Sequence, residues 1–153
     1  MFKGLTQRAQ KILTVLSQEE ARQSFADMLL PEHIILAILK DGEGLACRGL
    51  KSFNINCLTL HAELEAEVPR RSENYVYGDL PPSRRTRQLM DLAAKEAQDM
   101  VNSFIGTEHI FLAALLEKNA ILSKIMSKYN LDIDLLRASY HALSTNETNV
   151  NRN

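Results

Sequence analysis

The sequence predicts an all-α fold: eight helices in one compact domain, arranged as two four-helix copies related by a pseudo-twofold axis. The main observation is an internal repeat, because the segment 32–39 recurs 76 residues later as the segment 108–115. Apolar residues also return every three or four positions, as they do on one face of a helix. No segment shows a convincing strand pattern.

The spacing of the repeat changes once along the chain. Thr6 and Arg8 match Ser83 and Arg85 at a spacing of 77 residues, whereas later residues of the two copies match at 76. One residue has therefore slipped between Arg8 and Ala21.

The first two helices of each copy have different patterns. Apolar residues from Leu5 to Leu16 form a single helical stripe, and the matching helix of the second copy begins near Ser83, after the start signal Pro82. The second helix is apolar nearly all round, over residues 34–39 and 110–116. Because such a helix needs cover on every side, we expect it to be the central helix of its copy.

The third and fourth helices are marked by residues that suit helix ends. The third is expected over residues 44–53 and 120–129, each time followed by an asparagine, Asn54 or Asn130, that suits a left-handed C-terminal cap. The fourth is expected over residues 57–67 and 133–143, with Asp132 as the N-cap of the latter. The predicted division is the first copy at 1–68, a linker at 69–81, the second copy at 82–143, and a disordered tail or linker start at 144–153.

Composition and charge limit the classes of function that the sequence can have. The 153 residues are 45% hydrophobic and 24% charged, which is ordinary for one globular domain. A formal net charge of −1 gives no global field that recruits nucleic acid or an anionic membrane. No apolar run approaches the roughly 18 residues that span a bilayer, and the N-terminus lacks a secretion signal. We read Cys47 and Cys57 as reduced thiols of a cytoplasmic protein.

Motifs for catalysis are missing from the sequence. It contains no phosphate-binding loop, no nucleophile elbow and no H-E-x-x-H zinc helix. The pairs Glu32-His33 and Glu108-His109 do not have metal-ligand spacing, since adjacent helical positions diverge by about 100°. We expect a binding module that is not an enzyme, with no metal and no cofactor.

The two Glu-His pairs each open a strongly apolar helix. The simplest interpretation is that Glu32 and Glu108 complement the positive helix N-terminus, while His33 and His109 lie against the core with one ring nitrogen satisfied. The alternative for the glutamates is that each receives a guanidinium group in bidentate fashion.

Basic residues gather at the start of the first helix of each copy, as Arg8 in the first and as Arg84, Arg85 and Arg87 in the second. A solvated helix face accounts for most such runs. The alternative is an anion site, because Thr6 and Ser83 are candidate N-caps and a helix N-terminus beside an arginine binds phosphate well. Both kinds of feature together would suit a ligand that is cationic at one end and anionic at the other.

Several motifs carry a family resemblance. The first copy contains Leu5-Thr6-Gln7-Arg8-Ala9, Pro31-Glu32-His33-Ile34 and Asp41-Gly42-Glu43-Gly44, and the second contains Ile105-Gly106-Thr107-Glu108-His109-Ile110. With its two copies at the correct separation, the chain resembles the Clp repeats of the N-terminal domain of Clp unfoldases, the ClpC type in particular, from Met1 to about Leu143.

The resemblance implies a function. In that family the double repeat is not the ATPase but the front end that captures adaptor proteins, such as MecA, and protein substrates. It passes them to AAA+ rings that feed a peptidase such as ClpP. ClpC-type modules also receive phosphoarginine marks. The alternative function is a stand-alone Clp-repeat protein that docks on an assembled Clp protease and regulates it.

The resemblance also implies site residues. The guanidinium-binding glutamates would be Glu32 and Glu108, and the phosphate-side groups would be Thr6, Ser83, Arg8, Arg85 and Arg87. Leu30-Pro31 stands where the family usually has Gly-Thr, whereas the second copy keeps Gly106-Thr107. We therefore expect Glu108 to contribute more to binding than Glu32, and we expect both carboxylates to be exposed.

Overall fold

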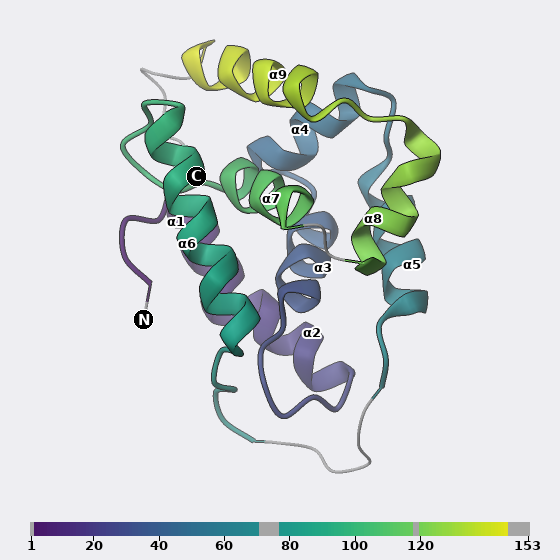
Figure 1. Cartoon of the computed structure of the whole chain (residues 1–153). Helices are drawn as coiled ribbons and strands as arrows, with labels where there is room; N and C mark the ends of the chain where they lie inside the picture. Colours follow the sequence, from purple (N-terminus) through teal and green to yellow (C-terminus); the bar gives the residue numbers. More distant parts are fainter. Residues whose placement is uncertain (1, 71–76, 118–119, 147–153) are drawn as a thin grey trace.

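The computed structural model describes residues 2–70, 77–117 and 120–146, and these residues form eight helices (Figure 1). The helices of the first copy are α1 (Gln7–Lys11), η1 (Ile12–Leu16) and α2 (Ser17–Gln23), which run on as one helix, then α3 (Pro31–Asp41), α4 (Leu45–Ser52) and α5 (Cys57–Glu67). Those of the second copy are α6 (Arg84–Asp99), α7 (Thr107–Leu116), α8 (Ala120–Met126) with its continuation η2 (Ser127–Tyr129), and α9 (Ile133–Asn146). The predicted all-α fold with four helices in each copy is confirmed.

The helices α3 and α7 lie in the middle of the molecule, with the other helices around them (Figure 1). Every residue from Pro31 to Leu39 is buried, and so is every residue from Thr107 to Ala114. This confirms the prediction that the helix that is apolar nearly all round is the central one. The core is continuous across both copies, since the buried side chains of α3 and α7 belong to a single cluster.

The slip of one residue in the repeat has a structural counterpart in η1, which is a π-helical turn. Here the Ser17 backbone N–H donates to the carbonyl of Ile12, five residues earlier instead of four. A π turn holds one more residue than an α turn. The corresponding helix of the second copy, α6, is α-helical from end to end. The first copy therefore accommodates its extra residue within this turn, and the helical segments before and after the turn keep the orientation that they have in the second copy.

Backbone conformations recur at the same spacing as the sequence. Among the described residues, four residues other than glycine have positive φ, and they form two pairs 76 residues apart: Phe25 with Val101, at 54° and 56°, and Asn54 with Asn130, at 61° and 49°. The asparagines confirm the predicted left-handed caps. Left-handed conformations are costly for Phe and Val, so the turns before α3 and α7 are held in place by their surroundings.

The predicted N-caps are formed. Thr6 accepts a hydrogen bond from the Ala9 N–H at 3.2 Å, Ser83 from the Thr86 N–H at 3.1 Å, and Asp132 from the Asp134 N–H at 2.8 Å. At the other end of the chain, α9 runs three residues beyond its expected end, to Asn146.

Parts of two predicted segments lie outside the described residues, namely 71–76 of the linker and 147–153 of the tail. At the end of the linker, Leu80 is buried, and its backbone N–H and carbonyl both bond to the side-chain amide of Gln18, at 2.7 and 3.1 Å. Among the helices of the described residues, none is long and apolar enough to span a membrane.

One close contact joins α4 of the first copy to α9 of the second. Tyr140 is fully buried, and its hydroxyl donates to the Ala46 carbonyl at 2.9 Å. Its ring lies directly over Gly49, where an added Cβ would come within 2.2 Å of the ring carbon Cε1. Gly49 is therefore required by this approach of the two helices and not by its backbone angles.

Replacing Gly49 by alanine should destabilise the fold by about 1–3 kcal/mol, because the new methyl group overlaps the Tyr140 ring. The free energy of unfolding, measured by urea denaturation, would show the loss. The matched comparison is Gly49→Ala in a Tyr140→Ala background, where the overlap is absent and the added cost should largely disappear. An equal cost in both backgrounds would contradict the assigned contact.

Candidate binding sites between the two copies

The start of each copy is tied to the centre of the other copy by a short bridge. Leu5 pairs with Ile105, where the Thr6 N–H donates to the Ile105 carbonyl at 2.9 Å. Leu29 pairs with Pro82, where the Ser83 N–H donates to the Leu29 carbonyl at 3.0 Å. The N-cap of α1 therefore lies beside the start of α7, and the N-cap of α6 lies beside the start of α3. Each candidate site is built from both copies.

The first of these sites joins α3 to α6. Arg85, two residues after the Ser83 cap, donates from Nη2 to Oε1 of Glu32 at 3.0 Å. The same Nη2 lies 3.8 Å from Oε1 of Glu117 at the C-terminal end of α7. Glu32 is buried, whereas half of the Arg85 side chain is exposed. A guanidinium group thus already lies at one of the two predicted glutamates, supplied by the protein itself.

The second site joins α1 to α7. Arg8 donates to Asp41 at 2.7 Å, and its other terminal nitrogen lies 3.8 Å from Glu43. Its aliphatic stem passes beside Thr107, since both side chains lie within 3.0 Å of where a Cβ on Gly44 would stand. Gly44 therefore allows Arg8 to approach the residue that precedes Glu108.

The structure corrects the expected exposure of the two glutamates. Glu32 is 6% exposed and Glu108 is 0% exposed, whereas the sequence predicts exposed carboxylates at both helix starts. The reason is the contact between the copies at the start of each central helix, where α6 packs on α3 and α4 packs on α7. Replacing either carboxylate therefore affects packing as well as charge.

The structure gathers the residues predicted to bind a ligand into two groups and leaves Arg87 outside both. The structure places Glu32 with Ser83 and Arg85, and it places Thr6 and Arg8 at the start of α7, where Glu108 lies. Arg87 is exposed, and within the described part of the chain it makes no ion pair with either glutamate.

Three acidic residues at these sites do not follow from the motif reasoning. They are Asp41, which accepts a hydrogen bond from Arg8, Glu117, whose carboxylate lies 3.8 Å from Arg85, and Glu43 beside Arg8. Asp41 and Glu117 are 76 residues apart, so the repeat itself carries the signal that would have indicated them.

Thr107 also has a role that the sequence does not reveal. Its hydroxyl oxygen accepts a hydrogen bond from the Ala46 N–H at 3.2 Å, which links the start of α7 to the start of α4. The hydroxyl that the first copy lacks at Pro31 therefore serves an inter-copy contact in the second.

The two histidines lie against the core as predicted, each with Nδ1 satisfied, and Nε2 of His109 also bonds to Oδ1 of Asn102 at 2.9 Å. Nδ1 of His33 accepts the Leu30 N–H at 2.9 Å, and Nδ1 of His109 accepts the Gly106 N–H at 2.8 Å. Each histidine thereby caps its own helix. Because Nδ1 must accept, the neutral ring is required, and burial lowers the pKa of His33 to about 4 against the opposing effect of Glu32.

Two helical copies that complete each other's sites define a pseudo-twofold helical repeat module. The family model described as the Clp repeat (R) N-terminal domain matches residues 4–129. The chain belongs to this family.

Known relatives agree with this assignment. The chain is 31% identical over 139 residues to an ATP-dependent Clp protease ATP-binding subunit ClpA homolog of Cyanidium caldarium, which covers 91% of the chain and 16% of the relative. It is also 31% identical over 151 residues to the negative regulator of genetic competence ClpC/MecB of Bacillus subtilis, covering 97% of the chain and 18% of the relative. The chain thus spans less than a fifth of the length of these relatives.

A solved structure supports the fold. The Hsp104 N-terminal domain of Candida albicans superposes with a TM-score of 0.73 at 22% identity, over 92% of this chain and 91% of that one. The agreement extends over both copies of the repeat.

Acidification should weaken the fold between pH 6.5 and 4 through His33. Its ordinary pKa is 6.5 and its folded pKa is about 4, so in this window the unfolded chain binds more protons than the folded one. The stabilisation is complete above pH 6.5 and is lost as the pH falls through 4, by roughly 3 kcal/mol in all. Urea denaturation at a series of pH values measures this loss.

The matched variant is His33→Gln, whose side-chain oxygen can accept the Leu30 N–H but does not titrate. Its free energy of unfolding should depend on pH less steeply than that of the wild type. Identical pH profiles would show that His33 is not the responsible group.

Proposed function

We propose that this module captures protein substrates and adaptor proteins for a Clp unfoldase in the cytoplasm, and that it recognises arginine phosphates on them. Membership of the Clp repeat family supports the general role, since Clp N-terminal domains are binding modules of Hsp100 chaperones. The partners would be adaptors, substrates and the AAA+ rings of the unfoldase, and the module itself performs no catalysis.

The contact between Arg85 and Glu32 supports recognition of a guanidinium group. A carboxylate at the buried start of α3 receives a guanidinium at 3.0 Å. Charge-assisted bonds of this kind are among the stronger polar contacts in proteins. The same residue type stands at the start of α7 as Glu108. An arginine side chain is therefore chemically suited to both positions.

The N-caps beside these glutamates support recognition of the phosphate. Thr6 and Ser83 open helices whose first N–H groups carry partial positive charge. Arg8 and Arg85 follow each cap by two residues. A phosphoarginine would offer its guanidinium to the glutamate of one copy and its phosphate to the helix N-terminus of the other.

Access to the glutamates requires movement of side chains. Glu32 is held by Arg85, and Glu108 is fully buried. At Glu32 the incoming guanidinium must displace one that is tethered to the same chain. At Glu108 it must displace packing around Arg8 and Thr107. Because the second copy keeps Gly106-Thr107 where the first has Leu30-Pro31, we propose Glu108 as the stronger site.

Calorimetric titration with free phosphoarginine tests this function, with arginine and inorganic phosphate as separate controls. We expect saturable binding of phosphoarginine alone. The isosteric variant Glu108→Gln removes the charge with least change of packing, and it should weaken binding by about tenfold or more, which corresponds to about 1.4 kcal/mol. Glu32→Gln should weaken it less.

Circular dichroism must show that both variants remain folded, because both carboxylates are buried. Equal losses in the two variants would contradict the ranking of the sites. Undiminished binding in the double variant, or no binding by the wild type, would overturn the proposed recognition of arginine phosphate.

A further inference from the structure

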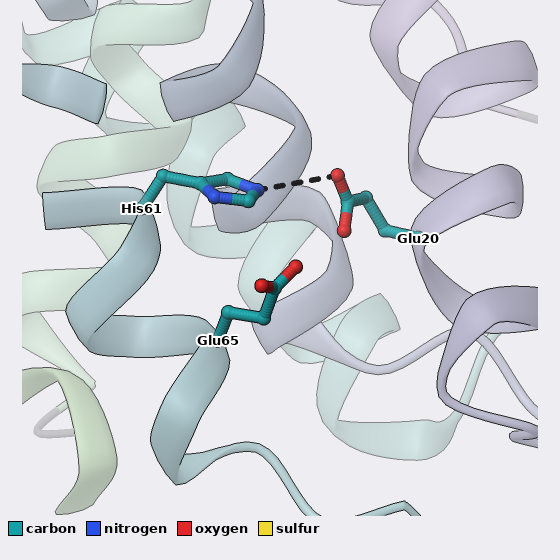
Figure 2. Close-up of side chains that lie close together, drawn as sticks. All are labelled: Glu20, His61 and Glu65. Carbon is teal, nitrogen blue, oxygen red and sulfur yellow. Dashed lines mark hydrogen bonds and ion pairs between the residues drawn. The ribbon is translucent and has the colours of Figure 1, made fainter. Parts of the chain in front are cut away.

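A second cluster of polar side chains lies away from both candidate binding sites, between α2 and α5 of the first copy. Nε2 of His61 lies 3.3 Å from Oε1 of Glu20. Glu65 follows His61 by one helical turn, and one ligand atom from each of the three residues lies within 4.8 Å of the others. Figure 2 shows the three side chains converging, Glu20 from one helix and the other two from successive turns of α5.

In the second copy the corresponding residues form an ion pair that links two helices. Glu20 corresponds to Glu96 and His61 to Arg137, each 76 residues later. Arg137 donates two hydrogen bonds to the carboxylate of Glu96, from Nε at 3.2 Å and from Nη2 at 3.0 Å. In both copies the pair links the first helix of the copy to its last.

The first copy replaces the arginine of this link by a histidine. A guanidinium is permanently protonated and cannot coordinate a metal, whereas a neutral imidazole is among the commonest metal ligands. The histidine also makes a poorer link than the arginine, because it offers one contact to the carboxylate where Arg137 offers two. The first copy therefore has a weaker link to its glutamate than the second, but its histidine can coordinate a metal ion.

Glu65 supplies what a metal site requires beyond this pair. Residues at i and i+4 of a helix face the same side, and this is a spacing at which helices chelate metals. Glu65 has His141 at the corresponding position of the second copy, so the carboxylate at this place is particular to the first copy. One imidazole and two carboxylates are ligands that Zn²⁺ accepts, with a water molecule completing four-coordination.

The geometry is close to what such an ion needs. Zn²⁺ holds its ligands at about 2.0–2.2 Å, so that neighbouring ligand atoms of a tetrahedral site lie about 3.3 Å apart. His61 and Glu20 already have this separation. Glu65 is exposed and can move the remaining distance. The only other cation near Glu20 in the described residues is Lys40 at 4.0 Å, and its exposed side chain can turn to solvent.

We propose that Glu20, His61 and Glu65 form a Zn²⁺ site that ties α2 to α5 in the first copy. The bound ion would replace the ion pair that Glu96 and Arg137 make in the second copy. This site differs from the Glu-His pairs at the helix starts, whose spacing does not suit a metal, and it does not depend on the proposed recognition of phosphoarginine.

The test is calorimetric titration of the full chain with ZnCl₂ in a buffer that does not chelate metals. We expect one ion bound for each chain, together with a rise in the thermal midpoint, since a ligand that binds only the folded state stabilises it. Glu65→Gln should weaken binding by about tenfold or more.

The decisive control is His61→Arg, which recreates the link of the second copy. This variant should keep its helical circular dichroism and its midpoint in the absence of metal, yet it should neither bind Zn²⁺ nor be stabilised by it. Loss of binding together with an intact fold supports the site.

Three results would overturn the proposal. The first is the absence of saturable binding by the wild type, and the second is equal binding by His61→Arg. The third is a thiolate charge-transfer band when the chain is loaded with Co²⁺, because it would place the ion on Cys47 or Cys57 instead of on nitrogen and oxygen ligands.

Discussion

The structure depends on covering two helices that are apolar on nearly every side. Each copy supplies most of the cover of its own central helix, α2 and α5 for α3 and α6 for α7, and the other copy completes it, since α3 also packs on α6 and α7 also packs on α4. The bridges from Leu5 to Ile105 and from Leu29 to Pro82 are where this sharing begins, because they place the first helix of each copy against the start of the other's central helix. The buried Glu-His pairs and the inter-copy sites all follow from that exchange.

A helix of this fold can accept an inserted residue only if both of its ends keep facing the same partners. An inserted residue would rotate the rest of an α-helix by about 100°, which would turn either the Thr6 cap or Glu20 away from its partners. The π turn from Ile12 to Leu16 takes up the extra residue within one turn. Both ends of the first helix therefore keep the roles that α6 has in the second copy.

Equivalent positions have diverged where the neighbouring volume or charge can be supplied in another way. Gly49 and Tyr140 combine the smallest and one of the largest residues at the contact of α4 with α9. Their counterparts 76 residues away, Ile125 and Leu64, are buried and of similar size. The exchange of Arg137 for His61 is the corresponding case for charge. The pseudo-twofold symmetry is thus one of backbone and packing more than of side-chain chemistry.

The sequence by itself determined the helices, their caps and the repeat, because these depend on residues within a few positions of one another. The N-caps at Thr6 and Ser83 and the left-handed turns at Asn54 and Asn130 follow from local hydrogen bonding and backbone preference. Only the tertiary structure decided that the copies cross, that Glu32 and Glu108 are buried, and that Arg85 reaches Glu32 across 53 positions of the chain. Such choices depend on which surfaces meet after the helices have formed, and no local pattern of residues specifies that.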